Sequence, residues 1–292
     1  MSLASNDNKD VDAHTGTSTT GHEWDGIREL NTPLPKWWLN IFYATIVWAF
    51  FYTLAYPAYP LISDFTKGLL GWSSRAAVTQ EIADLQAMRA PMVQALASAS
   101  FEQIEKDPKL LAFARAQGKA AFGDNCAPCH GAGGGGAKAF PNLVDDDWIW
   151  GGRNEDIQAT ITHGIRSADP QSRVGNMPAL EGILKPSEMI LVAEYTRSLS
   201  GLAVAKNVDL KAGAQIFADN CSACHGPEGR GNQEIGALNL TDQIWLYGSD
   251  QKTILEGIAK GRGGMMPNWN DRLDAGTIKA LAVYVRTLGG GR

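Results

Sequence analysis

The sequence predicts an all-α protein in which one N-terminal membrane-spanning helix precedes two tandem copies of one helical domain. A charge-free apolar stretch runs from Trp37 to Ser63, and the segment around residues 118–131 is repeated around residues 213–226, in a region without strand-like alternation. The expected divisions are a polar cytoplasmic tail over 1–36, a transmembrane anchor over 37–60, a helical linker over 61–107, and two domains over 108–202 and 203–292.

The balance of charged residues argues against a nucleic-acid-binding protein. The chain has 292 residues, with 26 Lys and Arg against 31 Asp and Glu, and a net charge of -5. Residues 1–107 hold 7 basic and 12 acidic residues, whereas the rest of the chain holds 19 of each. No basic face of the kind that binds nucleic acid is indicated, so we expect no nucleic-acid partner.

The N-terminal third contains a tail and an anchor. Residues 1–36 are too polar to fold alone, and His14 and His22 are expected to be solvated rather than to bind metal. The twenty residues from Trp37 to Tyr56 would form a helix of about 30 Å, which matches a bilayer core. Because the apolar run starts late, is long and lacks a cleavage site, an uncleaved anchor is favoured over a signal peptide.

A linker helix and a capped helix follow the anchor. Ser73 to Ala97 has apolar residues at helical spacing, including Ile82 and Leu85. Asp107 followed by Pro108 has the form of an N-cap and first helical residue, which marks the start of the first domain.

The two domains are recognised as an internal repeat. "GKAAFGDNCAPCHG" at 118–131 matches "GAQIFADNCSACHG" at 213–226, "NLVDDDWIWG" matches "NLTDQIWLYG", and "AEYTRSLSG" matches "AVYVRTLGG". Each copy also contains a Met-Pro pair. Two copies of one domain account for this pattern better than one large domain does.

Both copies carry the attachment signature of a c-type haem, Cys-x-x-Cys followed directly by His. In this motif one helical turn presents two thiols to the porphyrin vinyl groups, and the adjacent imidazole ligates the iron. A zinc site gives no reason for the position of the histidine, a thioredoxin-like dithiol needs a βαβ setting, and a disulfide scaffold suits smaller proteins. We therefore expect two covalently attached haem c groups, held by Cys126, Cys129 and His130 and by Cys221, Cys224 and His225.

The methionine of each Met-Pro pair is the candidate for the opposite iron ligand. Met177 and Met266 lie 47 and 41 residues after their motif histidines. A thioether closes the iron and raises its reduction potential. Only Met266 of the pair Met265 and Met266 precedes proline, which restrains it. Sequence order leaves open whether each methionine serves its own repeat or the two are exchanged.

One other residue competes for these ligand roles. His163 is a rival iron ligand, but its counterpart in the second repeat is Lys260. Met189 falls within the last amphipathic helix of its repeat and is expected to be a core residue. We therefore prefer the two Met-Pro methionines.

The repeats resemble the cytochrome c superfamily. That resemblance implies that the helix before each haem motif crosses the last helix of the same repeat. Phe122 and Gly118 would then meet Tyr195, and the corresponding residues of the second repeat would meet Tyr284.

The N-terminal element "HEWDGIRELNTPLPKWW", followed by one anchor and two such domains, resembles the di-haem subunit III of cbb3-type cytochrome c oxidases. The resemblance implies an electron relay that does not itself reduce oxygen. Its donor would be a soluble or membrane cytochrome c or the quinol:cytochrome c reductase. Its acceptors would be the mono-haem subunit and then the catalytic haem-copper subunit of a proton-pumping complex.

Topology follows from the haem chemistry. Covalent haem attachment takes place outside the cytoplasm, so residues 1–36 are expected inside a bacterial inner membrane and residues 61–292 in the periplasm. Two alternatives are a free-standing membrane di-haem cytochrome c and a di-haem cytochrome c peroxidase. The peroxidase requires a haem with an open or displaceable ligand, whereas both repeats offer a Met-Pro pair.

Overall fold

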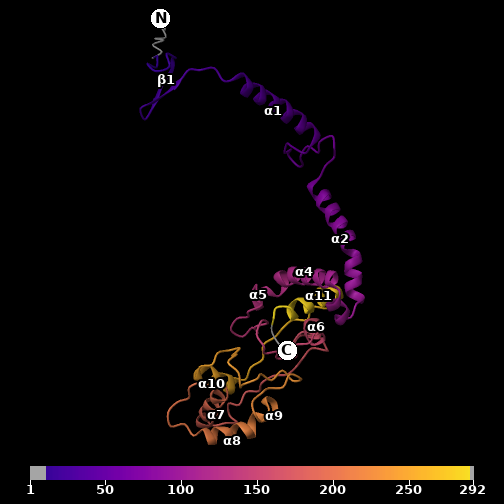
Figure 1. Ribbon diagram of the computed structural model, residues 1–292, viewed down its shortest axis with the longest axis vertical. Coiled ribbons are helices and arrows are strands. Elements are labelled where there is room, and N and C mark those ends of the chain that lie inside the picture. The colour runs from indigo at the N-terminus through magenta and orange to yellow at the C-terminus, as the bar shows by residue number, and fades with distance from the viewer. Residues whose placement is uncertain (1–10, 290–292) are drawn as a thin grey trace. The chain divides into compact units, whose positions relative to one another are not determined.

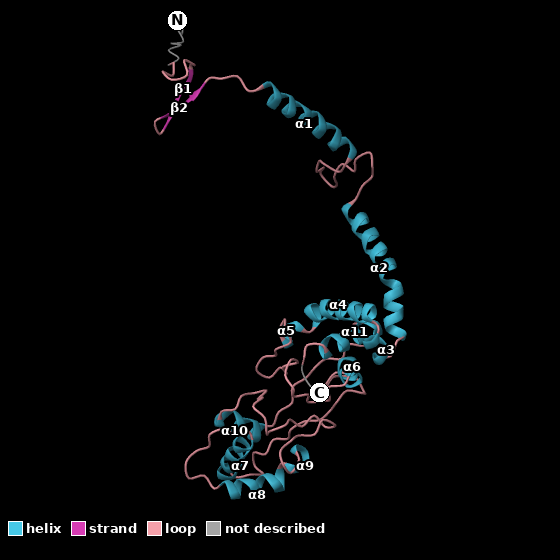
Figure 2. Ribbon diagram, viewed as in Figure 1, coloured by secondary structure: helices cyan, strands magenta, loops and turns pink. Residues whose placement is uncertain are grey.

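The computed structural model describes residues 11–289, and the chain divides into two compact units, Met1–Gln86 and Ala87–Arg292. Almost all regular structure is helical, as the sequence predicts, and the helices of the second unit are joined by long loops (Figure 2). The all-α prediction is confirmed, with one exception near the N-terminus.

The exception is a β-hairpin formed by β1 (Thr19–Trp24) and β2 (Ile27–Leu30), with Trp24 paired to Ile27. Asp25 and Gly26 form its turn with φ values of 50° and 84°. Both central residues of a type I′ turn need positive φ, and Asp-Gly supplies this at low cost. The expectation that the whole tail is too polar to fold is therefore wrong for residues 19–30, because the Asp-Gly turn allows these residues to pair as a hairpin.

The apolar stretch forms helix α1 (Lys36–Ala55), in which no residue is buried. Among the described residues it is the one helix long and apolar enough to cross a membrane. The helix ends one residue before the predicted Tyr56, because Pro57 disfavours helical geometry at Tyr56, which is extended. Leu69 and Leu70 donate backbone hydrogen bonds to the carbonyls of Leu54 and Ala55, which satisfies two groups at the helix end.

The linker helix α2 (Ser74–Ser98) crosses from the first unit into the second. The capped helix predicted at the start of the first domain is also found, as α4. Asp107 caps it by accepting hydrogen bonds from the amides of Lys109 and Leu110, with Pro108 in the first turn. The remaining helices of the second unit are α3 (Phe101–Lys106), α4 (Pro108–Asn125), α5 (Ala127–His130), α6 (Asn154–His163), α7 (Pro186–Leu199), α8 (Leu210–Asn220), α9 (Ser222–His225), α10 (Gln251–Lys260) and α11 (Ala275–Arg286).

These helices pack as two lobes, each with its own hydrophobic core. The first lobe contains α3, α4, α5, α6 and α11, and the second lobe contains α7, α8, α9 and α10. Helix α11 lies against α4 and α6, while α7 lies against α8 and α10 (Figure 1). The last helix of each sequence repeat therefore packs in the lobe of the other repeat.

The exchange is visible in the aromatic contacts. Phe122 packs on Tyr284 with ring centroids 5.4 Å apart, and Phe217 packs on Tyr195 at 5.5 Å. Gly118 lies so close to Tyr284 that a side chain at position 118 would collide with it. The expectation that Phe122 meets Tyr195 within one repeat is wrong, because the equivalent tyrosine of the other repeat occupies that place.

The connection between α7 and α8 gives a physical reason for the exchange. Only residues 200–209 separate these two helices, so α8 can pack on the helix that immediately precedes it. Elements that follow each other in sequence tend to be neighbours in space, and short connections cost little entropy to close. Once α7 is paired with α8, the free face of α4 is left for α11.

Candidate functional site

Each Cys-x-x-Cys-His motif sits on a single helical turn that follows a longer core helix. In the first lobe, α5 continues from α4 because the amide of Cys126 donates to the carbonyl of Phe122. The amide of His130 then donates to the carbonyl of Cys126, at 2.9 Å. The second lobe repeats this arrangement at α8 and α9. The turn brings the two cysteines and the histidine to one cavity, as the spacing predicts.

The motif histidines are oriented by backbone carbonyls. His130 Nδ1 lies 3.0 Å from the carbonyl oxygen of Pro141, and His225 Nδ1 lies 2.8 Å from that of Leu238. Because a carbonyl oxygen can only accept, each Nδ1 carries the proton, and the lone pair is left on Nε2. Burial lowers the pKa of both imidazoles, which favours the neutral form that binds metal.

The four cysteines all lie among the described residues and none is in a disulfide. Burial, reinforced by the neighbouring cysteine, raises the pKa of Cys126 and of Cys221 to about 11. Within residues 11–289 no cluster of three or more His, Cys, Asp or Glu is arranged to hold a metal ion. Cys126 and Cys221 are thus held as protonated thiols, and the described residues contain no preformed thiolate cage for zinc.

One cavity of about 740 Å³ is lined by both motifs. Apolar side chains of the two lobe cores form most of its wall, and Met177 and Met266 both border it. The two candidate haem sites therefore open into one continuous space rather than into separate pockets.

The two methionines stand in exchanged lobes. Met266 packs against the core of the first lobe, together with Cys126, whereas Met177 packs against the core of the second lobe, together with Cys221. Of the alternatives that the sequence leaves open, this placement favours the exchanged pairing. Met265 is 71% exposed.

Short backbone bridges fix these methionine positions. Met266 pairs with Ile165, and Met177 pairs with Arg262, so each methionine segment is bonded to the other repeat. Gly164 and Gly261, with φ values of 71° and 72°, lie directly against the carbonyls of Met266 and Met177. A side chain at either glycine would collide with that backbone, so the close approach requires glycine there.

The rival ligand His163 and the core residue Met189 both lie away from the iron-ligand positions. His163 does not line the cavity, and its Nδ1 contacts a carboxylate oxygen of Asp169 at 3.2 Å. Met189 packs into the core of the second lobe from α7, as predicted for a core residue.

The cavity has polar features that fit haem. The indole nitrogens of Trp148 and Trp245 are buried and have no hydrogen-bond partner among the described residues, although both rings line the cavity. Each carries an N–H donor that an acceptor such as a haem propionate would satisfy. Arg166 and Arg262 also line the cavity, and neither forms a salt bridge within the described part of the chain.

Sequence reasoning missed that each lobe places one arginine over an aromatic ring of the cavity wall. Arg173 lies 5.3 Å over the Trp150 ring and donates to the carbonyl of Asp156, in the first turn of α6. Arg262 lies 4.5 Å over the Tyr247 ring and donates to the carbonyl of Thr253, at the same position of α10. Trp150 and Tyr247 are equivalent in the alignment of the two repeats, whereas Arg173 and Arg262 are not. Each lobe therefore places a guanidinium over the equivalent ring, but from a different position in the sequence of its repeat.

Three family models match this chain. Residues 16–63 match the N-terminal domain of cytochrome oxidase-cbb3, FixP; residues 115–200 match cytochrome c; and residues 208–285 match cytochrome C oxidase, cbb3-type, subunit III. Together they cover the hairpin, the anchor and both repeats.

Relatives of the same kind match along almost the whole length. The chain is 61% identical to the cbb3-type cytochrome c oxidase subunit FixP of Azorhizobium caulinodans, over 97% of this chain and 96% of that one. It is 59% identical to the FixP subunit of a Bradyrhizobium species, over 98% and 99%, and 49% identical to the subunit CcoP of Azospirillum brasilense, over 97% and 99%. The chain therefore belongs to the FixP and CcoP family, the membrane di-haem cytochrome c subunits of cbb3-type oxidases, and binds two haem c groups covalently.

Proposed function

We propose that this subunit passes single electrons through two haem c groups whose irons are ligated by His130 with Met266 and by His225 with Met177. Cys126 with Cys129, and Cys221 with Cys224, would form the thioether bonds. The placement of each methionine in the core of the opposite lobe supports this pairing over one within each repeat. The domain bounds 108–202 and 203–292 then describe sequence repeats, while the haem sites are built across them.

When bound, the haem would supply the chemistry of this subunit, which is reversible one-electron transfer. The residues of the chain hold and tune that iron. Pro141 and Leu238 fix the imidazole tautomers through their carbonyls. The apolar cores would exclude water from the thioethers, and the indole N–H groups of Trp148 and Trp245 would donate to the propionates.

The single observation that carries this function is the shared cavity. Both motifs and both methionines border one space of about 740 Å³. Two haems placed there would have no complete protein wall between them, so an electron could pass directly from one to the other. A carrier needs such an arrangement, whereas a peroxidase needs one haem with an open face.

The route of the electron extends beyond the chain. We propose that the donor is a cytochrome c or the quinol:cytochrome c reductase, and that the acceptors are the mono-haem and then the catalytic haem-copper subunit. The subunit itself would not reduce oxygen. Family membership supports a place in the oxidase complex. Isolation of the protein from membranes tests this: copper and b-type haem should co-purify with it. A stable protein with haem c alone would indicate a free-standing carrier.

Carbon monoxide binding to the isolated reduced subunit separates a carrier from an enzyme. With both irons closed by methionine, we expect neither haem to bind carbon monoxide readily. Stoichiometric binding to one haem of the unmodified subunit would instead support the peroxidase alternative.

Orientation is proposed from chemistry. Residues 1–36 would be cytoplasmic, α1 would span the inner membrane once, and the haem region would be periplasmic, where covalent haem attachment occurs. An alkaline phosphatase fusion after Ser100 should be active and one after Leu30 inactive. The reverse pattern would contradict both the orientation and the haem assignment.

A further inference from the structure

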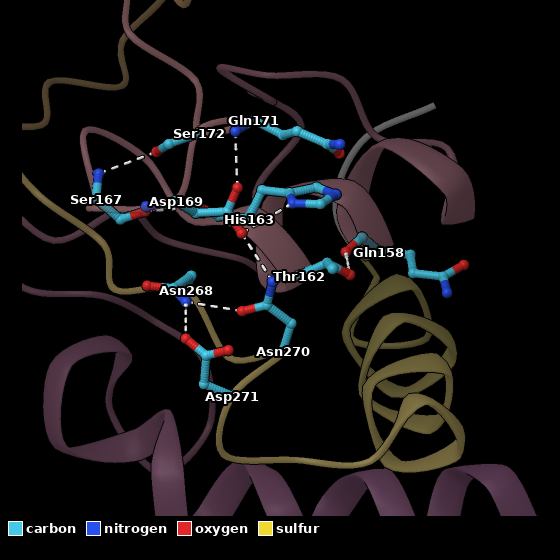
Figure 3. A network of polar contacts seen from close by, with 10 residues as sticks. All are labelled: Gln158, Thr162, His163, Ser167, Asp169, Gln171, Ser172, Asn268, Asn270 and Asp271. Carbon is cyan, nitrogen blue, oxygen red and sulfur yellow. Dashed lines mark hydrogen bonds and ion pairs between the residues drawn. The ribbon is translucent and has the colours of Figure 1, made fainter.

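The segments that lead to the two methionines differ in length. Met177 follows Gly164 by 13 positions, whereas Met266 follows the equivalent Gly261 by only 5. The first repeat therefore carries eight extra residues between α6 and its methionine. These residues do not simply extend a loop, because they form a hydrogen-bonded network (Figure 3).

The network centres on Asp169, whose side chain is only 8% exposed. Its backbone amide donates to the hydroxyl of Ser167, and its Oδ1 accepts from the amide of Gln171 at 2.7 Å. The Ser167 hydroxyl in turn donates to the carbonyl of His163. The carboxylate is thus held rigidly by its own loop. The hydrogen bond from Gln171 is the main cause that lowers the pKa of Asp169, so it stays an ionised acceptor.

The other oxygen of this carboxylate reaches the second repeat. Asp169 Oδ2 accepts from Asn270 Nδ2 at 2.7 Å and contacts His163 Nδ1 at 3.2 Å (Figure 3). Asn270 is four residues after Met266. Asn268 Nδ2 donates both to Asn270 Oδ1 and to Asp271 Oδ2, so side-chain hydrogen bonds also hold together the segment that follows Pro267. A residue of the extra segment in the first repeat is therefore hydrogen-bonded to the segment that follows Met266 in the second repeat. We call this contact between Asp169 and Asn270 the Asp169 clamp.

The segment that follows Met177 makes the same backbone contacts but has no side-chain contact of this kind within the described residues. Leu180 and Glu181 donate to the carbonyls of Ile258 and Ala259, as Trp269 and Asn270 donate to those of Ile161 and Thr162. Within the described residues, no side-chain carboxylate of the second repeat accepts a hydrogen bond from the segment 178–182 that follows Met177. The two methionines are thus presented on matched backbones, only one of which is clamped.

We propose that Asp169 is a positioning residue for Met266, and that it holds this methionine on the first-lobe iron more firmly than Met177 is held on the second. The inference rests on the proposed role of Met266 as an iron ligand. Asp169 acts through Asn270 and does not itself touch the haem site. The consequence is an asymmetry between two otherwise equivalent haems, built by residues that only the first repeat contains.

Isosteric replacement tests the clamp. Asp169→Asn keeps a side-chain oxygen that accepts from the Gln171 amide. Its other terminal atom becomes an N–H donor, which cannot accept the hydrogen bond from Asn270 Nδ2. A hydrogen bond to a charged group is lost, so the population with Met266 displaced should rise about tenfold. In the purified di-haem protein we expect faster carbon monoxide binding at one haem, a lower reduction potential for that haem, and weaker ferric long-wavelength absorption. The other haem should be unchanged.

Matched variants make the result interpretable. Asp271→Asn makes the same chemical change in the same segment without a contact to the first repeat, and should leave both haems unaffected. Asn270→Ala removes the contact from an exposed position, so it should reproduce Asp169→Asn even if the latter assembles poorly. Asp169→Asn combined with Asn270→Asp restores a donor and acceptor pair and should recover the parental potential.

Met266→Leu distinguishes failure of the clamp from failure of the ligand assignment. If Met266→Leu opens one haem while Asp169→Asn and Asn270→Ala behave like Asp271→Asn, the clamp is refuted and the ligand assignment stands. If Met266→Leu itself leaves both haems closed, the ligand assignment is refuted and the clamp with it.

Discussion

The two lobes contain the same set of contacts, although each lobe combines helices from both sequence repeats. Phe122 with Tyr284 in the first lobe matches Phe217 with Tyr195 in the second, and each motif histidine has a backbone carbonyl partner. The lobes differ where contacts are not needed to hold a haem. The hydrogen bond from Asn270 to Asp169 has no counterpart in the second lobe within the described residues, and Asp147 stands where the second repeat has Ile244. Shared contacts therefore mark the requirements of the site, and differences mark where the two haems can be distinguished.

The largest expected effect is loss of one haem. Cys126→Ser combined with Cys129→Ser removes both thiols of the first motif, while the second lobe keeps its own pair. Covalent haem should fall by about half, because each motif attaches one group independently. Pyridine haemochrome absorbance per polypeptide measures this. Loss of all covalent haem in a protein that still folds would show that the lobes are not independent.

The exchange of methionines can be tested in such single-haem proteins. When only the second haem is present, Met177→Leu should abolish methionine ligation and lower the potential of that haem, because a sulfur ligand is lost. Met266→Leu should leave it unchanged. When only the first haem is present, Met266→Leu should abolish methionine ligation and Met177→Leu should leave the haem unchanged. Ferric long-wavelength absorption and potentiometry measure both properties.

The opposite pattern would be equally clear. If Met266→Leu opens the second haem and Met177→Leu the first, each methionine serves its own repeat. Met265→Leu is the matched control in both backgrounds, since it changes the neighbouring exposed residue.

Helix exchange predicts a specific coupling energy. Phe122→Ala should cost about 3 to 5 kcal/mol of unfolding free energy, as expected for a buried aromatic side chain. A double-mutant cycle between Phe122 and Tyr284 should give about 0.5 to 1.5 kcal/mol beyond area burial. The same cycle between Phe122 and Tyr195 should give a value near zero. Denaturant unfolding followed by haem absorbance measures each cycle, and coupling to Tyr195 alone would contradict the exchange.

The last prediction concerns the ionisation of Asp147. Burial, with repulsion from Asp242 and Asp145, raises the pKa of its carboxyl from 3.8 to about 6. The folded state therefore binds this proton more tightly than the unfolded state, and stability falls as the pH rises from about 4 through about 6. Asp147→Asn stays neutral, so it should stabilise the protein by about 1 to 2 kcal/mol at neutral pH and by nothing in acid.

Denaturant midpoints across this pH range measure the difference. Asp146→Asn is the control, because this neighbouring side chain is exposed and carries the same charge. An equal effect from both substitutions would mean that general charge, rather than burial at position 147, sets the pH dependence.

The sequence by itself determined the chemistry of this protein. Cys-x-x-Cys-His is a local pattern in which one helical turn fixes the relative positions of both thiols and the imidazole, so the cofactor could be read from five residues. The span of α1 was equally local, because its length and apolarity are properties of the segment itself. The hairpin at residues 19–30 was also readable in principle from Asp25-Gly26, but the polar composition around it outweighed that signal.

Tertiary structure alone decided which parts of the two repeats belong together. Tyr195 and Tyr284 are equivalent residues on equivalent helices, so either could pack on Phe122 without violating any pattern in the sequence. The choice depends on chain connectivity: the short link from α7 to α8 lets these neighbours pair, and α11 then fills the remaining face of α4. The methionines follow their helices, so the lobe that each one enters is fixed by long-range packing rather than by its distance along the chain from a histidine.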